Sequence, residues 1–208
     1  YMAFALALTA FIAMGAASSQ EFMYAIHSSG LKWIIAFAPL GMAFYMGSKL
    51  MSMSQTAAQS CLMIFAALMG LSLSSIFIVF TGESIARVFF ITASTFGAMS
   101  IYGHNTKRDL SSMGSFLMMG AVGLLISGVV NIFLKSSAIY FISSVIGVVV
   151  FTLFTAYDTK RVKELYYQNQ GNEGVASKLA IYGSLTLYMD FINLFVFLLQ
   201  LLGVRRSD

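Results

Sequence analysis

A single carboxylate inside the last apolar run constrains this chain more than any other residue. The run from Leu179 to Gly203 is long enough to cross a lipid bilayer, and Asp190 is its only charged residue. An ionisable side chain in the lipid core is costly unless it faces other helices, a charged partner or water. Asp190 lies about 16 Å along a helix from Leu179, so we expect it near the middle of the bilayer. This segment is therefore predicted to be the most buried helix of a bundle.

The face of the segment that carries Asp190 is small and polar, whereas the rest is apolar. Residues three or four apart share one face of a helix, and here they are Gly183, Thr186, Asp190 and Asn193. We expect this face to lie against other helices or a water-filled cavity, where Thr186 and Asn193 would line a pore or support the carboxylate. The plainer alternative is that Asp190 only holds helices together through hydrogen bonds.

Composition places the whole chain in the membrane. Of its 208 residues, 59% are hydrophobic and 10% are charged, whereas a soluble domain has about 25% charged residues. We expect one all-α transmembrane domain over residues 1–208, in contact with lipid and with no nucleic-acid partner despite a net charge of +4. A single cysteine excludes a disulfide framework. The chain begins inside an apolar run, so we also expect an N-terminal tail and the start of the first helix to be missing.

Seven apolar segments are close to the length of about 20 residues that a transmembrane helix needs. They are residues 1–17, 31–48, 57–80, 85–103, 113–134, 138–157 and 179–203. The predicted fold class is an integral membrane bundle of seven transmembrane helices with the seventh central. The polar connection from Asp158 to Lys178 is predicted to be a surface loop. Small residues on one face of the fourth segment are a packing signal, and they are Ala93, Gly97 and Ser100.

The basic residues of the connections predict the orientation, because cytoplasmic loops carry an excess of Lys and Arg. The connections after segments two, four and six hold seven such residues, and the other connections hold three. The seven are Lys49, Lys107, Arg108, Lys160, Arg161, Lys163 and Lys178. We expect this set in the cytoplasm, and a seventh crossing then places the C-terminus outside. Arg205 and Arg206 fall on the unexpected side, and a last segment that re-enters instead of crossing would remove this conflict.

Asp158, at the end of the sixth segment, is the second carboxylate at or within the membrane. Segments six and seven are antiparallel neighbours, so Asp158 and Asp190 can meet, although ideal straight helices would leave them at different depths. Two carboxyl groups in a dry site share a proton, because both cannot ionise cheaply. Their oxygens also suit a metal ion such as calcium. Lys49 is the nearest candidate counter-ion for Asp158, and Asn131 is a candidate donor to a carboxylate or an ion.

Other reactions of membrane proteins lack their motifs in this chain. An aspartyl intramembrane protease has Gly-x-Gly-Asp at its second carboxylate, where this chain has Leu-Tyr-Met-Asp, ending at Asp190. A rhomboid-like serine protease needs Gly-x-Ser-Gly with a histidine inside the membrane, and a retinal protein needs a lysine in the seventh segment. No metal motif or phosphate-binding loop is evident either. We therefore expect no enzymatic activity and no cofactor apart from calcium as a permeant or bound ion.

Four stretches of the sequence resemble the Bax-inhibitor family in its bacterial form. They are Gly-Leu-Ser-Leu-Ser-Ser-Ile-Phe (Gly70 to Phe77), Phe-Gly-Ala-Met-Ser-Ile-Tyr-Gly (Phe96 to Gly103) with Thr-Lys-Arg-Asp-Leu-Ser (Thr106 to Ser111), Ala-Tyr-Asp-Thr (Ala156 to Thr159), and Leu-Tyr-Met-Asp-Phe-Ile-Asn-Leu-Phe (Leu187 to Phe195). The resemblance covers nearly the whole chain, and the last stretch is the most specific.

The resemblance implies seven helices, with six wrapped round the seventh, and a pH-sensitive calcium leak across the bacterial inner membrane. Asp158 and Asp190 would form a hydrogen-bonded pair that senses protons and gates the pore. Relatives can carry an arginine near the start of the third helix that latches one aspartate. The corresponding stretch here, Met51 to Thr56, has no basic residue, which leaves Lys49 as the candidate latch. Other relatives resemble regulators of a membrane-bound protease complex, an alternative function that acts by protein contact and needs no pore.

Overall fold

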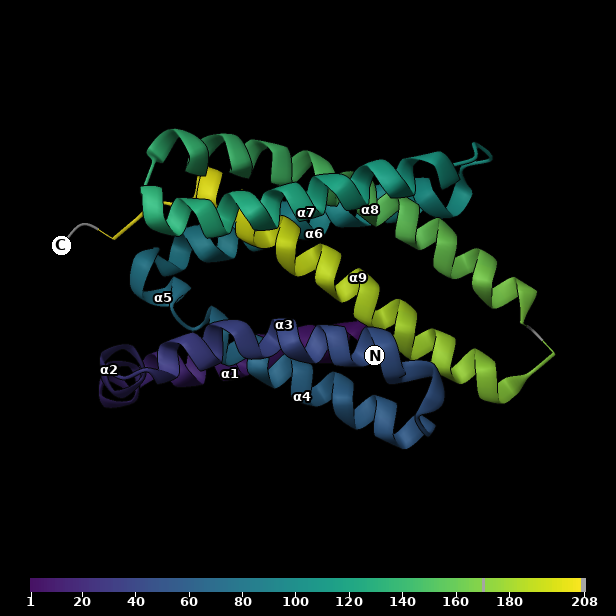
Figure 1. Cartoon of the computed structure of the whole chain (residues 1–208), viewed down its shortest axis with the longest axis horizontal. Coiled ribbons are helices and arrows are strands. Elements are labelled where there is room, and N and C mark those ends of the chain that lie inside the picture. The colour runs from purple at the N-terminus through teal and green to yellow at the C-terminus, as the bar shows by residue number, and fades with distance from the viewer. Residues whose placement is uncertain (170, 207–208) are drawn as a thin grey trace. The chain divides into compact units, whose positions relative to one another are not determined.

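The computed structural model describes residues 1–169 and 171–206, which are almost entirely helical (Figure 1). The helices are α1 (Met2–Ser18), α2 (Gln20–Ser28), α3 (Leu31–Lys49), α4 (Gln55–Leu73), α5 (Ile76–Val79), α6 (Gly82–Asn105), α7 (Ser111–Leu134), α8 (Ser137–Gln168) and α9 (Glu173–Leu202), with a 3-10 turn, η1 (Leu50–Ser52), after α3. Apart from an isolated bridge between Phe80 and Arg205, these described residues contain no strand. The predicted all-α class is confirmed.

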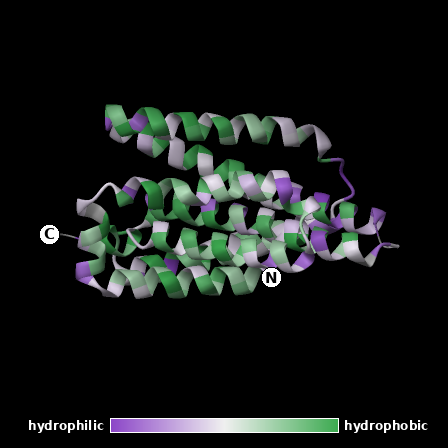
Figure 2. Ribbon diagram, turned by 60° about the horizontal axis from the view of Figure 1, so that its bottom comes forward, coloured by the Kyte–Doolittle hydropathy of each residue, from purple (hydrophilic) through white to green (hydrophobic). Residues whose placement is uncertain are grey.

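Six candidate membrane spans occur among the described residues, and they contain α3, α4, α6, α7, α8 and α9. Together α1 and α2 would make a seventh, but the chain bends by 97° between them. Ser19 starts the new helix, because its side chain accepts a hydrogen bond from the Phe22 N–H and caps α2. Apolar residues run along the helices, and hydrophilic residues gather mostly near helix ends and connections (Figure 2). The predicted membrane bundle is therefore present as six helices and one bent pair.

The last helix, α9, is the most buried of the six candidate spans. Half of the residues in its most apolar stretch are buried, compared with 11% to 28% in the other five. Its buried side chains include Tyr188, Asp190 and Phe191, whereas Thr186 and Asn193 are half-buried. A helix that carries a carboxylate within an apolar run needs such cover. The prediction that the last segment is the most buried is confirmed.

The chain divides into two compact units, and α9 contributes to both. The first unit contains Tyr1–Thr81 and Gln168–Leu185, and the second contains Gly82–Tyr167 and Thr186–Val204. Both carboxylates of the predicted pair belong to the second unit. The geometry of the candidate site can therefore be derived from the second unit alone.

In the first unit, α4 packs against α1 and α3. The Thr9 hydroxyl donates to the Ala66 carbonyl at 2.9 Å. A Cβ atom at Gly70 would lie 2.7 Å from the Thr9 carbonyl oxygen, so the close approach of α1 and α4 requires a glycine there. The first half of α9 joins this unit through Lys178, whose ammonium donates to the Met51 carbonyl at 3.0 Å.

The connection between α8 and α9 differs from the predicted surface loop. Instead of a loop from Asp158 to Lys178, α8 continues to Gln168 and α9 begins at Glu173. The prediction was wrong because a fall in hydropathy marks where lipid ends, not where a helix ends. The polar stretch contains good helix formers, and a 3.7 Å ion pair between Lys160 and Glu164 joins neighbouring turns. With 32 residues, α8 is about 48 Å long, longer than a hydrocarbon core of about 30 Å.

The end of the last segment lies beside the start of α6. The 30 residues of α9 form one continuous helix. After it, the Val204 N–H donates to Ser84 Oγ at the start of α6, at 3.1 Å. Lys107 and Arg108 follow the opposite end of α6. The last segment is therefore one unbroken helix, and its crossing of the membrane stays a prediction.

Candidate functional site

Helices α8 and α9 run antiparallel in the second unit, and two contacts define their register. The Ser144 hydroxyl donates to Gln200 Oε1 at 2.8 Å, and the rings of Phe151 and Phe197 stack with their centroids 5.8 Å apart. Residue numbers rise along α8 as they fall along α9. Residues two turns after Phe151 are therefore level with residues two turns before Phe197. Each helix carries its carboxylate at that level.

The structure brings Asp158 and Asp190 together. Their side chains are 5% and 4% exposed, and the two carboxyl groups share a hydrogen bond. Because an ionised carboxylate can only accept, this bond requires a proton on one of the two groups. Asp190 Oδ2 is buried and accepts no hydrogen bond from a donor group among the described residues. Asp158 lies well inside α8 rather than at its end, and this register removes the difference in depth that ideal helices would have left.

Helix α6 forms a third wall beside the pair. A Cβ atom at Gly103 would overlap the backbone carbonyl of Ala156, so the two backbones touch two residues before Asp158. On the other side, the ring of Phe96 packs edge-on against Phe191 of α9 with centroids 5.5 Å apart. One side of α6 thus contacts both carboxylate-bearing helices. Helix α6 therefore packs on α8 and on α9 close in sequence to Asp158 and Asp190.

Two lysines fasten the end of α6 to α8 just beyond the pair. The Lys163 ammonium donates to the His104 carbonyl at 2.6 Å, and the Lys160 ammonium donates to the Arg108 carbonyl. Lys160 also forms the ion pair with Glu164. A carbonyl at the end of a helix has no partner within that helix. These two cations therefore hold the connection between α6 and α7 in place.

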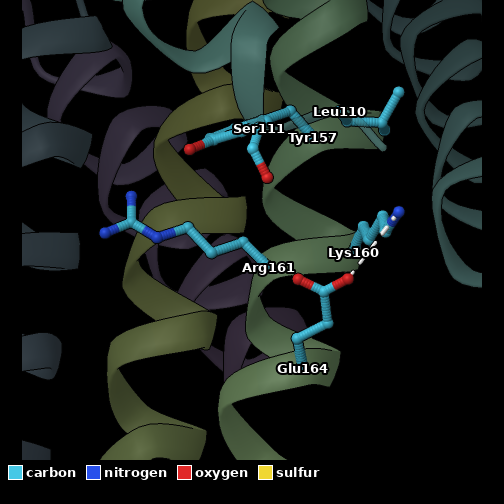
Figure 3. Close-up of a pocket in the computed structure, with 6 residues that line it drawn as sticks. All are labelled: Leu110, Ser111, Tyr157, Lys160, Arg161 and Glu164. Carbon is cyan, nitrogen blue, oxygen red and sulfur yellow. Dashed lines mark ion pairs between the residues drawn. The ribbon is translucent and has the colours of Figure 1, made fainter. Parts of the chain in front are cut away.

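A pocket of about 200 Å³ opens beside this part of α8 (Figure 3). It is lined by Leu110, Ser111, Tyr157, Lys160, Arg161 and Glu164. Figure 3 shows the Glu164 carboxylate turned toward Lys160 and the Arg161 side chain extended in the opposite direction. Arg161 follows Asp158 by one helical turn, and its charge acts on that carboxylate. Among the described residues Arg161 forms no ion pair, whereas Lys160 is paired with Glu164. Within this described part of the chain, Arg161 is therefore an unpaired cation that α8 contributes near Asp158.

Asp109, in the connection between α6 and α7, is an acid outside the membrane-spanning segments. Hydrogen bonds from the side chain and the backbone of Ser111 lower the pKa of Asp109 below 3.8. The backbone bond joins the Ser111 N–H to Asp109 Oδ1 at 2.9 Å. Asp109 therefore satisfies one of the free N–H groups at the start of α7.

The remaining polar candidates have different surroundings. Asn193 lies on the same helix as Asp190, but its amide donates to the Met189 carbonyl at 2.8 Å. Thr186 is half-buried one turn before Asp190. The Asn131 side chain accepts from the Ser136 N–H at 2.8 Å, in the turn between α7 and α8. Asn131 is therefore at the end of α8 away from the pair, and the structure does not bring it to the carboxylates.

Lys49 lies exposed in the last turn of α3, in the first unit. Its charge suits the carboxyl end of that helix, and its role as a latch stays a prediction. No three His, Cys, Asp or Glu side chains gather into a metal-ligand set among the described residues. A resident calcium ion takes six to eight oxygen ligands. Two carboxyl groups supply fewer oxygen atoms than this, and the binding of calcium by Asp158 and Asp190 stays a prediction.

Two further residues of the site were not among the predicted candidates. Gly103 allows the contact between α6 and α8, and Ser100, one turn earlier on α6, has a buried hydroxyl without a partner among the described residues. The sequence does mark Ser100 as one of the small residues on a single face of its segment. That pattern indicates packing, and it does not distinguish a hydroxyl needed for hydrogen bonding from one tolerated for its size.

Comparison with known proteins agrees with this architecture. The family model described as "Inhibitor of apoptosis-promoting Bax1" matches residues 1–207. An uncharacterized protein of Rickettsia prowazekii (strain Madrid E) is 48% identical over 207 residues, which cover 100% of this chain and 87% of the relative. The inner membrane protein YbhL of Escherichia coli (strain K12) is 42% identical over 208 residues, covering 99% and 89%. An uncharacterized membrane protein of Streptococcus pyogenes serotype M3 is 35% identical over 152 residues, covering 73% and 65%. The chain therefore belongs to the Bax-inhibitor family of membrane proteins, in agreement with the resemblance seen in its motifs.

Proposed function

We propose that this protein is a pH-sensitive calcium leak of the bacterial inner membrane, gated by Asp158 and Asp190. The observation that carries the proposal is the buried contact between the two carboxyl groups, on neighbouring helices and away from bulk water. Ionisable groups inside membrane segments mark ion paths and proton relays far more often than they serve packing. The placement of a similar protein, YbhL, in the inner membrane supports the location.

The gate follows from the chemistry of a shared proton. With one proton between them, the carboxyl groups form a hydrogen bond that holds α8 to α9. When that proton leaves, two like charges face each other at low dielectric, so they separate or attract a cation. Carboxylate oxygens are the ligands that calcium prefers. A rise in pH is therefore expected to open the leak.

Calcium flux into vesicles tests the gate. The parent protein, reconstituted with an enclosed calcium indicator, should leak faster as the pH rises, by about fivefold or more, the effect of a coupling of at least about 1 kcal/mol. Asp158→Asn and Asp190→Asn keep the shape of the side chain but cannot titrate, so each should flatten the pH dependence. Asp109→Asn is the matched control, because it removes an exposed acid outside the pair.

Two results would overturn the proposal. If both pair variants leak with the pH dependence of the parent protein, the carboxylates serve only to hold the helices together. If the parent protein admits no calcium at any pH, the chain is not a leak channel, whatever its carboxylates do.

A further inference from the structure

Two buried side-chain atoms lack a hydrogen-bond partner among the residues that the structure describes, and they are Ser100 Oγ and Asp190 Oδ2. Burying a polar atom without a partner costs free energy, so such atoms call for a physical explanation. One of the two is a hydroxyl, which can donate, and the other is a carboxyl oxygen, which can accept. They are chemically complementary.

The packing of α6 places Ser100 between contacts with the two helices that carry the pair. Ser100 follows Phe96 by one turn and precedes Gly103 by one turn, so all three share one side of the helix. Phe96 packs on Phe191, the neighbour of Asp190 in the chain. Gly103 packs on the Ala156 carbonyl, two residues before Asp158. Ser100 therefore stands between a contact with α9 and a contact with α8, within about 6 Å along the helix of each.

The hydroxyl of Ser100 differs from two other hydroxyls of its helix. Thr92 and Ser94 each donate to the carbonyl four residues earlier, at 2.8 Å. That bond is the usual way for a helical hydroxyl to be satisfied. Ser100 makes no such bond among the described residues, so its proton is available to a group on another helix.

The charged groups near the pair are bound to other partners or lie beyond Asp158. On α8, Lys160 is bound to a carbonyl and to Glu164, while Arg161 lies beyond Asp158. At the end of α6, the carbonyl of His104 accepts from Lys163, and at the start of α7 Asp109 is bound to Ser111. On α9, the acidic group of the pair is Asp190 itself. Ser100, whose buried hydroxyl has no partner among the described residues, is therefore the candidate donor from α6.

We propose that Ser100 is a positioning residue of the carboxyl pair: its hydroxyl donates to Asp190 Oδ2, directly or through one water molecule. This bond favours the ionised form of the pair, since a donor stabilises the charged oxygen it faces. The inference rests on the proposed function in one respect: the carboxyl pair must change its protonation state with pH. It adds a third hydrogen-bonding group, from a third helix, to the gate.

Infrared titration of the full chain in vesicles tests the inference without measuring flux. The C=O band of a protonated carboxyl group, assigned by its loss in Asp190→Asn, is followed against pH. Removing the donor with Ser100→Ala should move the midpoint to higher pH by about one unit. Ser100→Thr retains a hydroxyl and should stay close to the parent value. Ser94→Ala removes an exposed hydroxyl from the same helix and should change nothing.

Each result decides one question. A midpoint in Ser100→Ala equal to those of the parent and of Ser94→Ala overturns the role of Ser100, even if the leak depends on pH. A shifted midpoint with no calcium leak in the parent protein retains Ser100 and overturns the channel. If Ser100→Ala loses its helical circular dichroism, Ser100→Cys replaces it, and its weak thiol donor should give an intermediate midpoint.

Discussion

Asp190 and Asp109 show how the surroundings of an aspartate determine its role. Asp190 is buried in an apolar helix and hydrogen-bonds to a second carboxyl group, a bond that requires a proton on one of the two groups. Asp109 is exposed and accepts hydrogen bonds from Ser111, so its neighbourhood favours the charged form. The first arrangement is the one proposed above to respond to pH through a shared proton. The second is a helix cap that remains ionised in all but strongly acidic solution.

The cap predicts a titration that can be followed at one amide. Because Ser111 lowers the pKa of Asp109, the contribution of the cap is present above the ordinary carboxyl value and is lost as the pH falls through the lowered pKa. In detergent micelles, the Ser111 amide proton shift should therefore titrate with a midpoint below 3.8. Asp109→Asn should abolish the titration, and a midpoint at or above 3.8 would contradict the hydrogen bonds from Ser111 to the carboxylate.

At the scale of the helix, glycine spacing decides where α6 can approach its neighbours. Gly97 and Gly103 lie on the same helix, yet a Cβ atom at Gly97 would meet nothing within 4 Å, whereas one at Gly103 would overlap the backbone of Ala156. A backbone atom cannot rotate away as a side chain can. The contact beside the carboxyl pair therefore requires a glycine at residue 103, which has a hydrogen atom in place of a side chain.

These two glycines give a matched pair of substitutions. Gly103→Ala should destabilise the protein by about 1–3 kcal/mol, because α6 and α8 must separate to admit the methyl group. Gly97→Ala should be neutral or stabilising by up to about 1 kcal/mol, because alanine favours the helix and open space receives the methyl group. Thermal unfolding followed by circular dichroism compares the two. Equal midpoints would show that the backbones of α6 and α8 do not touch at Ala156.

At the scale of the whole molecule, the distribution of basic residues determines which way the bundle faces. Lys107, in the connection after α6, and Lys163, in α8, lie at the same end of the second unit, since Lys163 donates to the His104 carbonyl at the end of α6. Lys32 begins α3, at the opposite end of that helix from Lys49. The excess of Lys and Arg predicts that the first end is cytoplasmic.

Chemical labelling of intact cells tests this orientation. In a Cys61→Ser background, Lys107→Cys and Lys163→Cys should be protected from a membrane-impermeant maleimide and become reactive after lysis. Lys32→Cys should react without lysis. The reverse pattern would invert the topology, and it would place Arg205 and Arg206 on the cytoplasmic side.

The sequence alone determined the features that depend on each residue's own hydropathy and charge. The all-α membrane class, the approximate spans and the need to bury Asp190 follow from apolar runs, because lipid rejects unsatisfied polar groups wherever they stand. The motif around Asp190 was also sufficient to indicate the family. These properties require no knowledge of which helix lies beside which.

Only the tertiary structure decided what depends on contacts between distant residues. Hydropathy ended the sixth segment at residue 157, but hydrogen bonding carries α8 on to Gln168. That continuous helix, in register with α9 through Phe151 and Phe197, is what makes Asp158 level with Asp190. Asn131 was a candidate for the site, and its place in the sequence gave no sign that the turn after α7 would use its side chain. Ser100 looked like a packing residue, and only the structure showed that its hydroxyl is buried without a partner among the described residues, between contacts of α6 with α9 and α8. Helical spacing predicts a face but not the neighbour that the face meets.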